Sequence, residues 1–285
     1  MKSITFNCEV ITPMFLAGAD GSTPELRPAS IKGTLRFWWR AMNGDLGLEE
    51  LKKREGEIFG DNSSRSCFTI RITDRQINVG ESIPVPHKRY KISSINKGST
   101  FSVIFSIIES ESFNIGKLKS LFEITTILGG YGKRSRRAMG SIKIMKVESE
   151  GRTLPYENHI DSTYVFNLLQ KHSTHFQKRE QSIFLAYQGT MQPYPWIRQI
   201  EFGNDSGKNI PNLTSKTTHD LHGKYGQSYE PNLGHASKGR FASPVIVSVY
   251  ENENTPIITT LNTIPDRGQR DLDKFIQENF KKCIL

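Results

Sequence analysis

The chain has 285 residues, of which 36% are hydrophobic and 24% charged, a composition typical of one large or two small globular domains. Its 38 lysines and arginines exceed its 29 acidic residues, and a net charge of +9 favours a polyanionic partner, nucleic acid ahead of an anionic membrane. The longest apolar run, at 103–108, is far shorter than the roughly 20 residues of a membrane span, and the N-terminus lacks the apolar core of a signal peptide. Three widely separated cysteines argue against disulfides, so we expect a cytoplasmic protein without a membrane partner.

The first half alternates between strand and helix patterns. Alternating β-forming residues predict strands at 4–12, 67–73, 100–108 and 141–147. Helices are predicted after Ser30, acting as an N-cap, through Met42, and at 115–128, where the pattern ends at Gly129 and Gly130. The order β-α-β-β-α-β is that of a ferredoxin-like fold, and a glycine-rich loop joins its second helix to its last strand.

The second half has a less distinct pattern. We predict a polar linker at 149–155, a short helix at 163–170, a strand at 196–202, a long polar loop at 204–239, strands at 243–250 and 256–261, and a helix from Asp271. The pattern alone leaves open whether this half is a second, degenerate copy of the same fold.

The loop ILGGYGKRSRRAMGSIKI (127–144) combines glycines with clustered cations. It could present backbone N–H groups and side-chain charge together to phosphates, and a solvated turn is the alternative. It is not a nucleotide P-loop, because Ile127 stands in place of the first glycine and Arg134 in place of the Ser/Thr after the lysine. The candidate phosphate-binding residues are Gly129, Gly130, Gly132, Lys133, Arg134, Arg136 and Arg137.

The helix after Ser30 carries three further candidates. Lys32, Arg36 and Arg40 recur every four residues and so share one helical face, opposite an apolar stripe that includes Trp38. Stacked cations without an intervening carboxylate repel one another, so the face is either solvated or bound to an anion. Trp39 lies off the stripe and is a core residue or a platform for a base.

Catalytic patterns are poor. The pairs His172/His175 and His219/His222 lack further metal ligands, and a single Asp20 in a glycine-containing loop is typical of a turn. The sequence contains neither a GxSxG nor an HExxH motif. We therefore assign no catalytic residue, metal site or cofactor.

Two segments together carry a specific resemblance. The chain resembles the RAMP superfamily of CRISPR proteins, most closely the family of first-numbered subunits of Cmr (type III-B) effector complexes, in the segments ITPMFLAGAD...ELRPASIKGTLRFWWRAMNG (11–44) and LGGYGKRSRRAMGSI (128–142). PYPWIRQIEFG (193–203) and GRFASPVIVSVY (239–250) are similar to weaker blocks of that family.

The resemblance implies an α+β protein of tandem ferredoxin-like (RRM/RAMP) domains, the first at 1–150 and a degenerate second at 151–285. It also implies a non-catalytic subunit that binds CRISPR RNA, through its 3′ region or the guide–target duplex, beside other Cmr RAMP subunits. The glycine-rich loop at 129–140 is the family's RNA-contacting feature. RAMGSIKI lacks the aromatic residues of an RNP1 signature, so stacking of RNA on the sheet is not implied. A metal-independent endoribonuclease that processes CRISPR transcripts is the alternative, with Tyr131 or a histidine beside Lys133 as the base.

Overall fold

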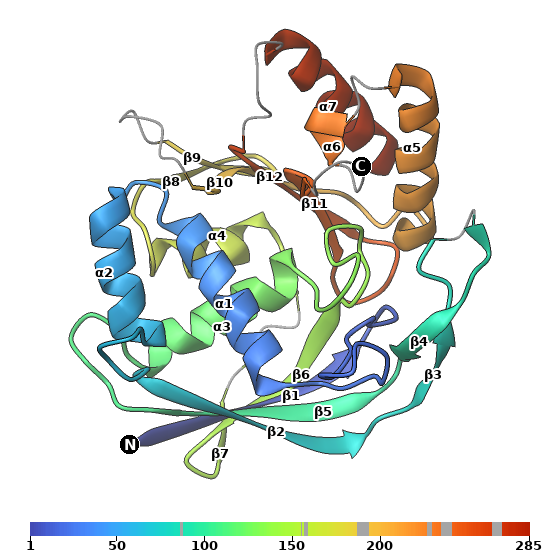
Figure 1. Cartoon of the computed structure of the whole chain (residues 1–285). Helices are drawn as coiled ribbons and strands as arrows, with labels where there is room; N and C mark the ends of the chain where they lie inside the picture. Colours follow the sequence, from blue (N-terminus) through green and yellow to red (C-terminus); the bar gives the residue numbers. More distant parts are fainter. Residues whose placement is uncertain are drawn as a thin grey trace.

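The computed structural model describes residues 1–85, 88–154, 156, 159–186, 194–226, 230–234, 241–263 and 270–285. In these ranges the chain forms four layers, namely an antiparallel sheet, a layer of helices, a second antiparallel sheet and outer helices (Figure 1). No helix in the described ranges is both long and apolar enough to cross a bilayer.

The first sheet has the predicted ferredoxin-like topology. Its strands β1 (Lys2–Val10), β2 (Phe68–Gln76), β5 (Thr100–Ile107) and β6 (Ile142–Ser149) are ordered β2-β5-β1-β6, so the first and third of the four are central. The helices α1 (Pro28–Met42) and α3 (Ile115–Leu128) cover one face. Strand β1 buries Ile4, Phe6 and Cys8, which alternate along the strand and therefore share a face.

Several elements of this half differ from the prediction. Helix α1 begins at Pro28 with Arg27 as its N-cap, not at Ser30, since the fixed φ of proline suits the first helical position. Helix α2 (Leu48–Phe59) and the hairpin of β3 (Val79–Ser82) and β4 (Ile92–Ile95) were not predicted. Strand β7 (Arg152–Leu154) occupies the expected linker and pairs with β6.

The second sheet repeats this order with one strand relocated. Its order is β11 (Val245–Val249), β12 (Pro256–Leu261), β10 (Ile197–Phe202), β9 (Ser182–Leu185) and β8 (Phe176–Arg179). Strands β10, β11 and β12 take the first, second and third ferredoxin-like places, and β9, which precedes β10 in the chain, takes the fourth. The fold is thus a degenerate second copy, as the resemblance implied.

Helices cover both faces of this second sheet. Helix α4 (Ser162–Gln170) lies between the sheets, and α5 (Ile210–Tyr225), α6 (Glu230–Leu233) and α7 (Arg270–Ile284) lie outside (Figure 1). Helix α5 replaces part of the expected polar loop, and the stretches of that loop at 227–229 and 235–239 lie outside the described residues.

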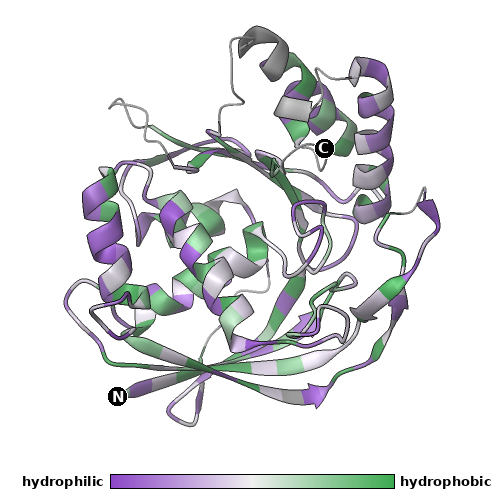
Figure 2. Cartoon of the chain, in the orientation of Figure 1, coloured by the Kyte–Doolittle hydropathy of each residue, from purple (hydrophilic) through white to green (hydrophobic). Residues whose placement is uncertain are grey.

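One apolar core joins the two halves. It contains Phe6 and Phe122 from the first half together with Ile200 and Ile257 from the second. A separate cluster fills the space between the second sheet and α5 to α7, and Ala138 of the glycine-rich loop belongs to it. Hydrophobic residues accordingly mark the strands of the second sheet, and hydrophilic ones mark much of α5 (Figure 2). The domain boundary at 150 stays a prediction.

Candidate nucleic-acid interface

The segment 129–140, called the glycine loop below, is held by backbone hydrogen bonds to distant parts of the chain. Lys133 N donates to Phe15 O at 2.9 Å, and Gly140 N donates to Pro13 O at 3.0 Å. On its other side, Ala138 N donates to Val247 O of β11 at 2.8 Å. The loop therefore bridges the two halves.

The glycines of the loop serve close packing of the chain against itself. Gly132 and Gly140 have φ of +87° and +70°, which favours glycine. Gly129 and Gly130 lie outside the left-handed region. A Cβ on Gly129 would come 2.6 Å from Trp38 Nε1, so the neighbouring helix requires a glycine there.

The cations of the loop separate into buried and exposed groups. Arg137 is 9% exposed, and its guanidinium donates to Leu233 O at 2.6 Å and to Val245 O at 3.1 Å. Lys133 is exposed, and no ion pair joins it to a carboxylate in the described ranges. Arg137 therefore supports the junction, and Lys133 is available to a ligand.

Arg136 and Arg134 are intermediate. The Arg136 guanidinium donates to Ser243 O and lies over the Phe37 ring, with Cζ 5.3 Å from the ring centroid. Its pKa falls to about 10, chiefly because burial disfavours the charged form and also because Arg137 is close. Arg134 is half-buried, has a φ of +64° and interacts within the chain.

The cationic face of α1 is compensated by α2. The buried Glu55 accepts hydrogen bonds from Arg40 Nε at 2.5 Å and Arg40 Nη2 at 2.7 Å, and it lies 3.2 Å from Arg36 Nε. Lys32 lies over the Phe68 ring, and burial, followed by the nearby Arg36, lowers its pKa. The spacing pattern of α1 contains no carboxylate for these cations, and Glu55 of α2, a helix that was not predicted, supplies it.

A cleft of about 280 Å³ separates the first turns of α1 from the glycine loop, and we call it the α1 cleft. Gly33 lies on its α1 side, and a Cβ there would meet no atom within 4 Å. The cleft brings Arg136 together with the loop glycines but excludes Arg36 and Arg40, which line a separate depression of about 500 Å³ beside α2. The cleft residues are Ser30, Gly33, Thr34, Phe37, Trp38, Gly129, Gly130, Gly132, Ser135, Arg136 and Ile246.

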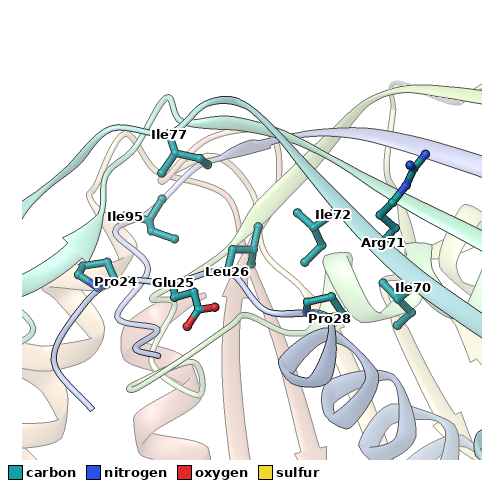
Figure 3. Close-up of a pocket in the computed structure, with 9 residues that line it drawn as sticks. All are labelled: Pro24, Glu25, Leu26, Pro28, Ile70, Arg71, Ile72, Ile77 and Ile95. Carbon is teal, nitrogen blue, oxygen red and sulfur yellow. The ribbon is translucent and has the colours of Figure 1, made fainter. Parts of the chain in front are cut away.

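A different cavity, of about 380 Å³, is aliphatic. Figure 3 shows Ile72, Ile77 and Ile95 around it and Arg71 pointing away from them. No group of cations converges among its lining residues, so it does not suit a phosphate. The remaining lining residues are Pro24, Glu25, Leu26, Pro28 and Ile70.

Asp20 and the two tryptophans of α1 have structural roles. Asp20 is exposed and accepts hydrogen bonds from Ser22 N and Thr23 N, both at 3.0 Å. The bond from the Thr23 hydroxyl and then those backbone bonds lower the pKa of Asp20, so bonds within its own turn hold it charged. Trp39 is 4% exposed and Trp38 is 1% exposed, which places both in the core.

The histidine pairs do not form a cluster. His172 shares a 2.8 Å hydrogen bond with Ser120 Oγ, and His175 lies 3.7 Å from Asp45. His219 and His222 are exposed on α5. In the described ranges, no three histidine, cysteine or acidic side chains are grouped as metal ligands would be.

Comparisons with known proteins identify a family model and two relatives. A family model of the RAMP superfamily matches residues 7–143. The CRISPR system Cmr subunit Cmr1-2 of Pyrococcus furiosus is 29% identical over 181 residues, covering 50% of this chain and 96% of that protein. Cmr1-1 of the same organism is 35% identical over 147 residues, which cover 45% of this chain but only 43% of Cmr1-1.

Solved structures share the fold over the whole chain. The crystal structure of apo Cmr1 from Pyrococcus furiosus has a TM-score of 0.62 at 19% identity, covering 100% of this chain and 96% of that one. A chain of the type III-B Cmr-beta complex, bound to cognate target RNA and AMPPnP, has a TM-score of 0.61 at 11% identity and full coverage of both. The resemblance found in the sequence is thereby confirmed: residues 7–143 match the RAMP superfamily model, and the chain is homologous to the Cmr1 subunits of the CRISPR Cmr system of Pyrococcus furiosus.

Proposed function

We propose that this chain is an RNA-binding, non-catalytic subunit of a Cmr-type CRISPR ribonucleoprotein acting against invading RNA. It contacts the guide RNA 3′ region or the guide–target duplex and assembles beside other Cmr RAMP subunits. The observation that carries the proposal is the α1 cleft, which Arg136 and the open position Gly33 line and whose Gly132 directly precedes the exposed Lys133. A relative's solved complex contains target RNA, which supports the same ligand class.

The surface suits phosphates better than bases. The α1 cleft offers the hydroxyls of Ser30 and Ser135 and one guanidinium, which can donate hydrogen bonds to phosphate oxygens, whereas the Thr34 hydroxyl donates to Ser30 O at 3.0 Å. Phosphate contacts of this kind orient a nucleic acid without reading its sequence, and base pairing between guide and target supplies the specificity.

The lining of the α1 cleft favours binding over the endoribonuclease alternative. Its described residues include no carboxylate, imidazole or thiol that could act as a general base near neutral pH. The Tyr131 hydroxyl, the base considered from sequence, is buried, and burial raises its pKa. No observation in the described ranges favours cleavage.

The test places a charge in the cleft without disturbing the fold. Gly33→Glu introduces a carboxylate where a side chain has room, and Gly33→Gln is its neutral counterpart of nearly equal size. Both residues are better helix formers than glycine, so both variants should fold. We expect Gly33→Glu to bind labelled RNA more weakly than Gly33→Gln, as measured by fluorescence anisotropy across a salt series.

Two further measurements complete the test. Lys133→Ala should flatten the slope of log K against log [salt] by about 0.7, the value for one lost contact with single-stranded RNA. Incubation with labelled repeat RNA in EDTA should give retardation without products. Discrete cleavage would establish the endoribonuclease, and wild-type affinity and slope in both Gly33→Glu and Lys133→Ala would refute the proposed binding site.

A further inference from the structure

A second cavity lined by the glycine loop lies between that loop and the β3–β4 hairpin. Its volume is about 310 Å³, and Lys133 and Lys91 both line it. Lys133 comes from the glycine loop and Lys91 directly precedes β4, so the cavity joins two segments that are far apart in the sequence. Its other lining residues are Phe15, Leu16, Ala17, Gly21, Ser22, Glu81, Ile92 and Ser93.

The hairpin and the glycine loop are fixed relative to one another by two consecutive residues. Met14 forms a bridge with Ile95 of β4, and both of its backbone hydrogen bonds to that residue are 2.9 Å long. The next residue, Phe15, forms the bridge to Lys133. The cavity is therefore held open by paired backbone on both sides.

The end of the hairpin is cationic and exposed. Four consecutive residues there are exposed, namely Lys88, Arg89, Tyr90 and Lys91, and 46% of the Tyr90 surface is accessible. No ion pair joins the three cations to a carboxylate in the described ranges. Figure 1 shows the hairpin extending beyond the first sheet, and Figure 2 shows hydrophilic residues at its outer end.

One carboxylate opposes these charges. Glu81 of β3 pairs with Ser93 across the hairpin and lines the same cavity. With Lys91 and Lys133 it leaves an excess of one positive charge in the lining, to which the exposed Lys88 and Arg89 add at the hairpin end. This charge balance favours an anionic ligand that runs along the surface, rather than a small anion enclosed in the cavity.

We propose that single-stranded RNA bound in the α1 cleft crosses the glycine loop at Lys133 and continues onto the β3–β4 hairpin. Lys133 and Lys91 hold one phosphate from opposite sides of the second cavity, and the Tyr90 ring stacks on a base. The inference rests on the proposed function and extends its site by the hairpin, which the sequence motifs did not indicate. A flat aromatic ring beside cations suits an unpaired base and not a duplex, whose bases are already stacked.

The experiment compares two lengths of fluorescein-labelled oligouridine on the purified chain. An oligomer of about 4 nucleotides can fill the α1 cleft alone, and one of about 12 can also reach the hairpin, since single-strand binding sites span about 4–16 nucleotides. Lys91→Ala and Tyr90→Ala are the test variants. Lys178→Ala is the matched control, because Lys178 is an exposed cation on β8, at the opposite edge of the second sheet from β11.

We expect Tyr90→Ala to weaken binding of the longer RNA about tenfold, within the range for one lost base stack, and to leave the shorter RNA and an RNA duplex unaffected. Lys91→Ala should reduce the salt slope for the longer RNA by about 0.7. Glu81→Gln should tighten binding of that RNA, because it removes the opposing charge.

The outcomes separate the two proposals. If the longer RNA binds Lys91→Ala and Tyr90→Ala as it binds Lys178→Ala, with equal melting temperatures, the hairpin is not an RNA contact. That result would fit a hairpin that contacts a neighbouring protein instead of RNA. Should the shorter RNA still respond to Gly33→Glu in that case, the proposed function stands and only the extension fails. If neither RNA responds to Gly33→Glu or to the hairpin variants, both the proposed function and its extension fail.

Discussion

Arg137 offers the sharpest contrast between a sequence assignment and a structural role. Its guanidinium donates to Leu233 O, Val245 O and Arg136 O, and its Cζ lies 5.5 Å from the centroid of the Phe280 ring. Arg137→Ala would remove the donor to the Leu233 carbonyl, at about 1–3 kcal/mol, whereas Val245 O keeps the Ser243 hydroxyl as a donor at 2.7 Å. We therefore expect a loss of about 2 kcal/mol in the free energy of unfolding.

A loss of this size is readily measured. At about 2–4 °C per kcal/mol for a chain of comparable size, the melting temperature should fall by roughly 4–8 °C. Circular dichroism gives the melting curve, and anisotropy at low temperature gives RNA affinity for the folded variant, whose salt slope should match wild type. Lys133→Ala is the matched control, with an unchanged melting temperature and a reduced slope. A melting temperature of Arg137→Ala close to wild type, with a reduced salt slope, would refute the structural role and restore the RNA contact.

Three further predictions concern backbone, pH and catalysis. Gly140→Ala should lower the free energy of unfolding, measured by urea denaturation, by more than about 2 kcal/mol, since a left-handed alanine costs about 1–2 kcal/mol and its Cβ would also collide with Tyr131 O. Gly33→Ala, in open space on a helix, should raise the free energy of unfolding by about 1 kcal/mol. Burial lowers the pKa of His172 from 6.5 to about 3, so the unfolded state binds more protons than the folded state between these pH values. The contribution of His172 to stability should be complete above pH 6.5 and fall as the pH drops, by up to about 1.4 kcal/mol per pH unit. His172→Gln should flatten that pH dependence. Complexes assembled with Asp20→Ala should cut target RNA at wild-type positions on a sequencing gel, because that carboxylate is engaged in its own turn; loss of one cut with RNA binding preserved would instead make this subunit catalytic.

Four of the five strands of the first sheet were predicted, and β1 shows why. Ile4, Phe6 and Cys8 alternate with more polar residues along β1, so period and burial agree. Helix α5 was missed because its apolar residues are few, with Ile210 and Leu221 buried near opposite ends of a mostly polar helix. Its capping residue, Asn209, accepts a hydrogen bond from Asn212 N, and together with Pro211 in the first turn it was a local signal of the helix start.

The candidate site was predicted in composition but not in orientation. The spacing of Arg36 and Arg40 correctly placed them on one face of α1, yet their shared partner Glu55 lies on α2, and no local pattern reveals such a pairing. In the glycine loop, Lys133 and Arg137 are equivalent by charge. Their opposite orientations follow from hydrogen bonds of the loop backbone to Phe15 and Val247, each more than a hundred residues away.

The division of charge within the glycine loop has a consequence for how binding and folding are connected. Arg137 fixes the loop to the second half, and its neighbour Arg136 lies over Phe37 of α1 and donates to Ser243 O. The guanidinium that faces the α1 cleft is thus already oriented before any ligand arrives. Little side-chain entropy remains to be lost when it contacts a phosphate, which favours affinity through preorganisation. The buried arginine therefore serves the exposed site indirectly, by keeping both halves and the intervening loop in one geometry.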